Sequence, residues 1–216
     1  RLYRKSGVAP RQSFPHRSPR PAAVALTVEE KPAVFVHYDG ATWAPSVPAG
    51  SLTPNDFYAV WGTSATDAWA VGSAGTLAHY DGKTWTLSGQ SGVTTTQILR
   101  GVWGDSASSY WAVGNSGVIL RFNASGWSIA NGSGVVTNTL LGIWGASPTS
   151  IWAVGTSGVI LAGNGTTWVR DPFMGAGFNS LLAVRGTQRD SVVAVGSGGS
   201  LYRYDGTAWK VDPKSG

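Results

Sequence analysis

Apolar and polar positions alternate in short runs of four to six residues along most of this chain. From Phe57 to Ser88 the runs are FYAVWG, DAWAVG, TLAHY and TWTLS, and short polar or glycine-containing segments separate them. Alternation with a period of two over so few residues predicts β-strands, and the separators predict tight turns. We therefore expect four strands, termed a, b, c and d, at residues 57–62, 67–72, 76–80 and 84–88.

The four-strand pattern recurs every 41 or 42 residues, and three series of positions contain all 11 tryptophans. The series are Trp43, Trp85, Trp127, Trp168 and Trp209; Trp61, Trp103 and Trp144, followed by Arg185; and Trp69, Trp111 and Trp152, followed by Val193. A repeat of this length is typical of the four-stranded blades of a β-propeller. Because blades bury their faces against one another, we expect the tryptophans to pack between blades rather than to bind a ligand.

The repeat predicts an all-β protein with about five blades. Four complete blades are expected at residues 57–88, 98–130, 139–170 and 180–212, within a propeller domain at residues 31–216. A half blade at residues 34–47 precedes them, and residues 23–28 resemble a degraded strand b for it. Residues 15–20 make a poor strand a, since proline removes a ladder donor. Three interpretations stay open: a five-bladed ring with a degenerate first blade, part of a longer propeller, or a blade completed by a partner chain.

The turn between strands c and d has a specific signal. Asp39-Gly40, Asp81-Gly82, Asn164-Gly165 and Asp205-Gly206 each lie shortly before a strand d tryptophan, whereas Asn123 is followed by alanine. Such dipeptides favour a two-residue hairpin turn with positive φ at both central residues. We expect that turn at these four places, and a longer or more relaxed turn at Asn123.

The net charge of +5 belongs to the first segment of the chain. Residues 1–31 hold seven of the 16 basic residues and both glutamates, while residues 32–216 carry nine basic residues and nine aspartates. Residues 1–30 are therefore expected to form an extended arm rich in arginine and proline, suited to an acidic or membrane-proximal partner surface. The arm residues expected to make this contact are Arg1, Arg4, Lys5, Arg11, Arg17 and Arg20. The neutral body argues against specific nucleic-acid binding.

The body offers little that is typical of catalysis. It has no cysteine and no glutamate after Glu30, and no nucleophile elbow, phosphate-binding loop or dinucleotide fingerprint is present. His37 and His79 share one position of strand c, and we align that column with Leu120, Leu161 and Tyr202, which indicates packing. We expect no enzyme activity, no catalytic residue, no metal site and no cofactor. No apolar run reaches the length of a membrane-spanning helix.

Binding is expected on the loops that join blades. An amide column precedes strand a in each complete blade: Asn55, Gln97, Asn138 and Asn179. These amides either cap their own turns or form a polar ring at the mouth of the channel, on the face shared by the d–a and b–c loops. The last d–a loop adds apolar residues that have no counterpart in the repeat, namely Phe173, Met174 and Phe178. We expect these seven residues to contact a partner or ligand.

The motif VWGTSATDAWAVGSAGTLAHYDGKTW at residues 60–85 resembles the tandem repeat of bacterial propellers, many of them in proteins expected to be secreted or on the cell surface. The repeat is also distantly similar to the propellers of photosystem assembly factors and to Asp-box propellers. It departs from the Asp box, because Asp81 lies four rather than five residues before Trp85. The resemblance implies the fold and is nearly silent on function.

Two hypotheses follow. The first is a non-enzymatic propeller that binds protein partners, such as an accessory subunit of a larger assembly tethered by its basic arm. The alternative is a lectin-like propeller of a secreted or surface protein that binds glycans through the repeated amides. The sequence favours a secreted, surface-exposed or complex-associated protein without fixing its location.

Overall fold

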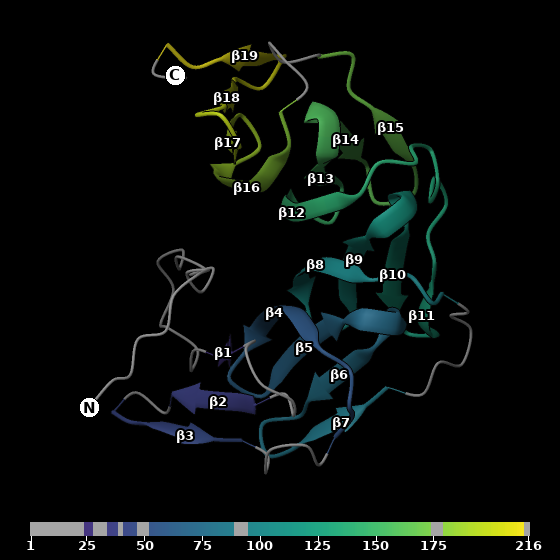
Figure 1. The fold of residues 1–216 in the computed structure, drawn as a ribbon, viewed down its shortest axis with the longest axis vertical. Helices are drawn as coiled ribbons and strands as arrows, with labels where there is room; N and C mark the ends of the chain where they lie inside the picture. Colours follow the sequence, from purple (N-terminus) through teal and green to yellow (C-terminus); the bar gives the residue numbers. More distant parts are fainter. Residues whose placement is uncertain are drawn as a thin grey trace.

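The computed structural model describes residues 24–27, 34–38, 41–46, 52–88, 95–173 and 179–213. Within these residues the chain is all-β, and its strands form five antiparallel sheets that follow one another around an axis (Figure 1). Each sheet is a meander of neighbouring strands, as the alternating pattern predicted. This arrangement is that of a β-propeller, so the predicted fold class is confirmed.

The four complete blades contain strands a to d in sequence order, and each runs from the axis to the rim (Figure 1). The a, b, c and d strands of the four blades are, in turn, β4 (Phe57–Ser64), β5 (Asp67–Gly72), β6 (Leu77–Tyr80) and β7 (Trp85–Leu87); β8 (Leu99–Ser106), β9 (Ser109–Gly114), β10 (Ile119–Asn123) and β11 (Gly126–Ile129); β12 (Leu140–Ser147), β13 (Ser150–Gly155), β14 (Ile160–Gly163) and β15 (Trp168–Arg170); and β16 (Leu181–Gln188), β17 (Ser191–Gly196), β18 (Leu201–Tyr204) and β19 (Trp209–Val211).

The first sheet has three described strands, β1 (Val24–Thr27), β2 (Val34–Tyr38) and β3 (Trp43–Pro45). Strand β1 pairs with β2 and lies within residues 23–28, where a degraded strand b was expected. The sheet is attached through Phe35, which is fully buried and contacts the rings of Phe57 and Trp85 in the next blade. Residues 15–20, the poor strand a, lie outside the described residues.

Tryptophans fill the junctions between blades. Nine of them are buried, and Trp69 contacts the rings of Tyr110, Phe122 and Trp127 in the following blade. Trp111 meets Trp168 in the same way at the next junction. The exception is Trp43, which is 53% exposed although its four counterparts on strands d are buried. The prediction that the tryptophans pack between blades is confirmed for every position except this one and the half-buried Trp61.

Near the axis, the tryptophan on strand a of one blade contacts strand a of the next blade. The indole Nε1 of Trp61 donates a hydrogen bond of 2.8 Å to the carbonyl of Gly104 in the next blade. A Cβ atom on Gly145 would lie 2.5 Å from the ring of Trp103, so glycine is required where one blade approaches the indole of its neighbour. The series ends at Arg185, whose guanidinium lies 5.6 Å from the Trp61 ring. The side chain of Arg185 in the last complete blade therefore reaches Trp61 of the first.

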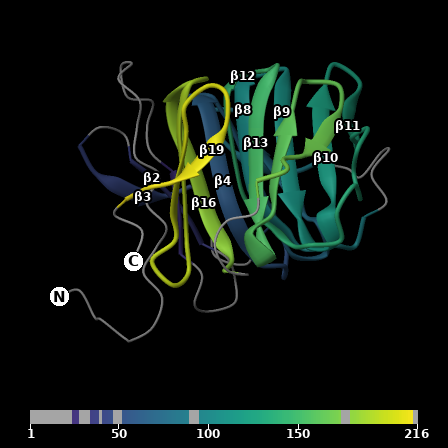
Figure 2. The same ribbon diagram turned by 90° about the horizontal axis from the view of Figure 1, so that it is seen from above.

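The described blades form an open arc in Figure 1, with an opening between β1 and β16. The outward face of the last blade is correspondingly exposed. Val195 is 42% exposed, whereas Val71, Val113 and Val154, its counterparts in the preceding blades, are fully buried. Figure 2 shows the strands of successive blades running along a common direction, so each added blade covers the face of the one before it. The five sheets agree with the predicted propeller of about five blades, and no described strand of the first sheet pairs with a strand of the last.

The c–d turns differ from the expected type. Gly82, Gly165 and Gly206 have φ near +90°, but neither the preceding Asp or Asn nor the following residue has positive φ. The expectation of positive φ at both residues of the dipeptide is therefore wrong. At Asn123 the positive φ moves to Gly126, but Phe122 pairs with Trp127 at the same separation as Tyr80 with Trp85, so this hairpin differs in backbone conformation and is not longer. The Asp39-Gly40 turn lies outside the described residues.

No helix in the described part of the chain has the length and apolar character needed to cross a membrane.

Candidate functional site

A β-bulge interrupts the innermost strand of every complete blade at the same place. The ladder between strands a and b skips one residue between Phe57 and Ala59, and it skips the equivalent residue in the other three blades. Bulges bend the strand and commonly redirect a side chain. The residues at these positions are Tyr58, Arg100, Leu141 and Leu182, here termed the bulge row.

The bulge row lies on neighbouring innermost strands, at the end next to the d–a loops. Its first three members are half-buried and Leu182 is exposed. The guanidinium of Arg100 lies 4.9 Å from the ring of Tyr58, and its Nε donates a hydrogen bond of 3.2 Å to Oδ1 of Asn115. Stacking and hydrogen bonding hold this cation in place, and no carboxylate of a described residue forms an ion pair with it. The row therefore presents a fixed cation between an aromatic ring and two leucines.

The predicted amide column lies on the same face, where each amide bonds within its own blade. Asn55 donates to Oγ1 of Thr76, Asn138 to the carbonyl of Thr156, and Asn179 to Oγ of Ser200. The side-chain oxygen of Gln97 accepts a hydrogen bond from Ser116 in the b–c turn of its blade. The amides thus hold the d–a segment onto the b–c turn, and their contact with a partner or ligand stays a prediction. No feature of the described residues supports the glycan-binding alternative.

The apolar loop of the last blade is described only at one end. Phe173 is half-buried and packs at 5.1 Å, edge to face, against Tyr202 of its own blade. Met174 and Phe178 lie outside the described residues, as do the arm residues Arg1, Arg4, Lys5, Arg11, Arg17 and Arg20. Their partner contacts stay predictions.

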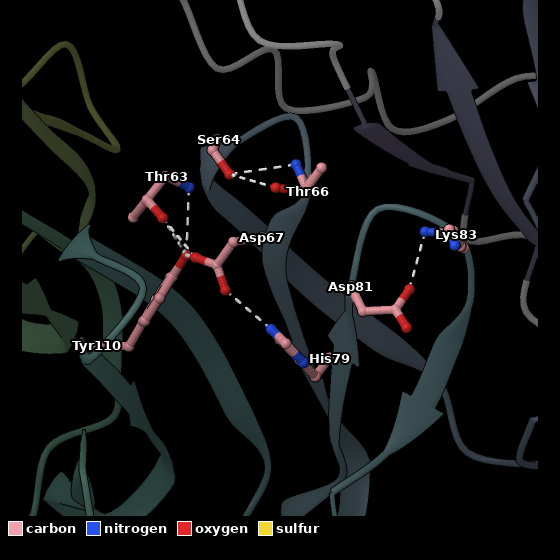
Figure 3. Close-up of polar contacts among 8 residues, drawn as sticks. All are labelled: Thr63, Ser64, Thr66, Asp67, His79, Asp81, Lys83 and Tyr110. Atoms are coloured by element: carbon pink, nitrogen blue, oxygen red, sulfur yellow. Dashed lines mark hydrogen bonds and ion pairs between the residues drawn. The ribbon is translucent and has the colours of Figure 1, made fainter.

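A second polar constellation lies between the first two complete blades (Figure 3). The carboxylate of Asp67 is buried and accepts hydrogen bonds from the hydroxyls of Thr63 and Tyr110 and, at 2.8 Å, from Nε2 of His79. Tyr110 belongs to the neighbouring blade, so the cluster joins two sheets. A buried carboxylate is costly unless it is fully hydrogen-bonded, and here three donors satisfy it.

The surroundings shift the pKa of both acids in this cluster. Burial alone would raise the pKa of Asp67, but the hydrogen bonds from Thr63, Tyr110 and His79, together with the attraction of His79, hold it below its usual value. Burial raises the pKa of the Tyr110 phenol, and the adjacent Asp67 carboxylate raises it further. Tyr110 therefore acts as a hydrogen-bond donor and Asp67 as a charged acceptor at neutral pH.

Sequence reasoning missed this cluster because it placed His79 in the wrong column. The strand register pairs His79 with Trp69, and the equivalent pairs show that its counterparts are Arg121, Ala162 and Arg203. The expected alignment with Leu120, Leu161 and Tyr202, and the packing role drawn from it, are therefore wrong for His79. Counting from the strand b tryptophans through the b–c turn would have given the correct column. The side chain of His37 lies outside what the structure describes.

No group of three or more histidine, aspartate or glutamate side chains in the described ranges is arranged to hold a metal ion. Asp67 already accepts three hydrogen bonds, from Thr63, His79 and Tyr110.

The fold and its bulged inner strands place the molecule among the β-propellers. No protein-family model matches the sequence, and no curated protein matches it. Solved structures do match. The YCF48 protein bound to a D1 peptide superposes with a TM-score of 0.63 at 16% identity, covering 89% of this chain and 64% of that one.

Two further solved structures show the same likeness. YCF48 from Cyanidioschyzon merolae gives a TM-score of 0.62 at 19% identity over 86% of this chain and 65% of its own. Sqt1 from Chaetomium thermophilum gives 0.66 at 12% identity over 90% and 56%. The chain therefore spans less than two thirds of the length of each of these propellers. At such identities the likeness concerns the fold alone.

Proposed function

We propose that this chain is a non-enzymatic propeller that binds protein segments and serves as a scaffold or accessory subunit of a larger assembly. The bulge row carries the proposal. It brings tyrosine, arginine and leucine side chains together on one face, and tyrosine and arginine are enriched at protein interfaces. A neighbour of the same fold was solved with a peptide bound to it, which supports this class of ligand. We also assign the repeat to the bacterial tandem-repeat type, on its motif alone.

The amides and Asp67 are committed to hydrogen bonds inside the blades. The basic arm is proposed to strengthen attachment to an acidic surface. A chain lacking residues 1–30 should then bind anionic lipid vesicles or acidic polypeptides more weakly than the full chain. Equal binding by the two chains would remove the arm from the proposal.

The function can be tested with a displayed library of random 12-residue peptides. We expect enriched peptides to bind the full chain and to lose about tenfold or more in affinity in the Leu182→Asp and Arg100→Ala variants. Leu87→Asp is the matched control, because Leu87 is also exposed but lies on strand d of another blade. Its affinity should stay unchanged. A library that yields no enriched peptide, or peptides indifferent to both bulge-row changes, would contradict the proposal.

A further inference from the structure

An open hollow of about 600 Å³ lies beside the Asp67 cluster, between the first two complete blades. It is lined by the a–b turns of both blades and by strands c and d of the first, so it opens on the face opposite the d–a loops. The bulge row lies at the other end of the innermost strands. The hollow is thus a separate surface, which the proposed function does not use.

The lining of the hollow is rich in hydrogen-bond acceptors and carries no lysine or arginine side chain. It includes the carboxylates of Asp67 and Asp81, the imidazole of His79, the rings of Trp69 and Phe122, and four hydroxyl side chains: Ser64, Thr66, Thr86 and Ser88.

The imidazole of His79 and the carboxylate of Asp81 both keep an acceptor for a ligand. Because Nε2 of His79 donates to Asp67, its Nδ1 is the acceptor of the neutral ring. Oδ1 of Asp81 accepts from the backbone N–H groups of Lys83 and Thr84, and no hydrogen bond of a described residue is recorded at its Oδ2 (Figure 3). This environment suits a ligand that is positively charged and donates hydrogen bonds.

The equivalent position at the next junction already holds a cation. There the counterpart of His79 is Arg121, and its guanidinium lies 5.0 Å from the ring of Trp111, the counterpart of Trp69. The repeat therefore accommodates a guanidinium at this place beside strand b. In the first complete blade the arginine is replaced by the shorter histidine, whose ring lies 4.7 Å from Trp69. The replacement leaves a hollow with acceptors around it and no side chain of its own blade to fill it.

We propose that this hollow binds one arginine side chain of a partner protein. The guanidinium would lie against Asp81 and His79, and its aliphatic stem would lie along Phe122. Arginine fits better than lysine because a planar guanidinium offers several donors to a carboxylate and an imidazole at once. Asp67 is a positioning residue, since its carboxylate orients the His79 ring and fixes which nitrogen accepts.

The test uses the peptide acetyl-Gly-Arg-Gly-amide and its citrulline analogue, which keeps the shape but has no charge. Titration of the full chain, followed by NMR at the Trp69 indole N–H, should give a dissociation constant on the order of millimolar for the arginine peptide. The citrulline peptide should bind at least about tenfold more weakly, and added salt should weaken the arginine peptide further. Equal binding of the two peptides would overturn the proposal.

Two variants taken from the repeat itself locate the site. His79→Arg installs the residue of the next blade, so it should fill the hollow and abolish binding. Asp81→Asn installs the residue that two other blades carry in this turn, so the turn should persist while affinity falls about fivefold or more. Asp205→Asn, the same change in the last blade, should have no effect.

If a folded Asp81→Asn chain binds as well as the unchanged protein, the hollow is not the site. Leu182→Asp should leave the arginine peptide unaffected, so this proposal and the proposed function can fail independently.

Discussion

The buried carboxylate of Asp67 shows how a single residue changes one junction of a regular repeat. Its counterparts are serines, Ser109, Ser150 and Ser191, which carry no charge. The aspartate is tolerated because Tyr110, whose own counterparts are alanine, isoleucine and valine, brings a hydroxyl from the next blade. Two departures from the repeat thus compensate each other across an interface.

Low pH should lower the free energy of unfolding, because it protonates the carboxylate of Asp67. Its pKa is lowered in the folded protein, so the stabilisation is complete above the unfolded value near pH 4 and is lost as the pH falls through the folded pKa. The free energy of unfolding in urea should therefore differ most between the unchanged chain and Asp67→Ser at pH 5 and above. This difference should shrink toward pH 2. Ser150→Ala, at the same position of another blade, should give a difference that does not depend on pH. If the difference in the free energy of unfolding between the unchanged chain and Asp67→Ser does not change with pH, the Asp67 carboxylate is not the source of the acid sensitivity.

At the scale of one element, the b–c turn carries backbone strain in three blades. The one-turn 3₁₀ segments Ser73–Gly75, Asn115–Gly117 and Thr156–Gly158 each place a non-glycine residue in the left-handed region, with φ between 52° and 56°. The last blade has Gly198 at this position, with φ of 60°. The turn is kept because the following glycine packs against the next d–a segment, where a Cβ on Gly75 would lie 2.2 Å from the carbonyl oxygen of Thr95.

Ala74→Gly should stabilise the protein by about 0.5–1 kcal/mol, because Ala74 is exposed and glycine adopts its φ of 52° without strain. The melting temperature and the urea midpoint would measure the gain. Ala107→Gly is the opposite control, since Ala107 is exposed in an a–b turn and has no positive φ. It should be neutral or slightly destabilising. If both changes act in the same direction, strain at Ala74 does not explain the result.

The blades themselves could be predicted from the sequence because their signals are local. Turn residues and tryptophans recur with the repeat, so the strands and buried columns of the complete blades followed directly. The bulge row did not follow, because a bulge that occurs in every blade leaves the spacing of the columns unchanged. The bond between Asp67 and Tyr110 was also hidden, since it joins residues 43 positions apart in two different blades. Its partners are set by how neighbouring sheets stack, which the spacing does not specify.

At the scale of the whole molecule, residues at the same position of the repeat differ in burial because the blades form an open arc. Val154 is fully buried between two blades, while Val195 is 42% exposed on the last one. Val154→Ala should lower the free energy of unfolding by about 2 kcal/mol or more, because it removes buried methyl groups and leaves a cavity. Val195→Ala should cost less than about 0.5 kcal/mol. Equal costs would mean that a partner or a second copy covers the last blade in solution.

The two faces of the arc have different chemistry. The d–a face carries the bulge row, with a fixed arginine beside aromatic and aliphatic groups. The opposite face carries the acceptor-rich hollow at the first junction. Near the axis Trp61 and Arg185 lie between these two regions. A partner bound on one face therefore need not displace a partner bound on the other.

The bond between Asp67 and Tyr110 also bears on how such a chain can grow by gene duplication. The last two junctions between complete blades have no such pair of aspartate and tyrosine, so an extra blade copied into either one would not separate a bond of this kind. An extra blade copied from the first, third or last complete blade and placed between β7 and β8 would separate Asp67 from Tyr110 and leave a buried charge beside an alanine, isoleucine or valine. In lineages that lengthen or shorten this repeat, the first two complete blades are therefore expected to be inherited as a pair.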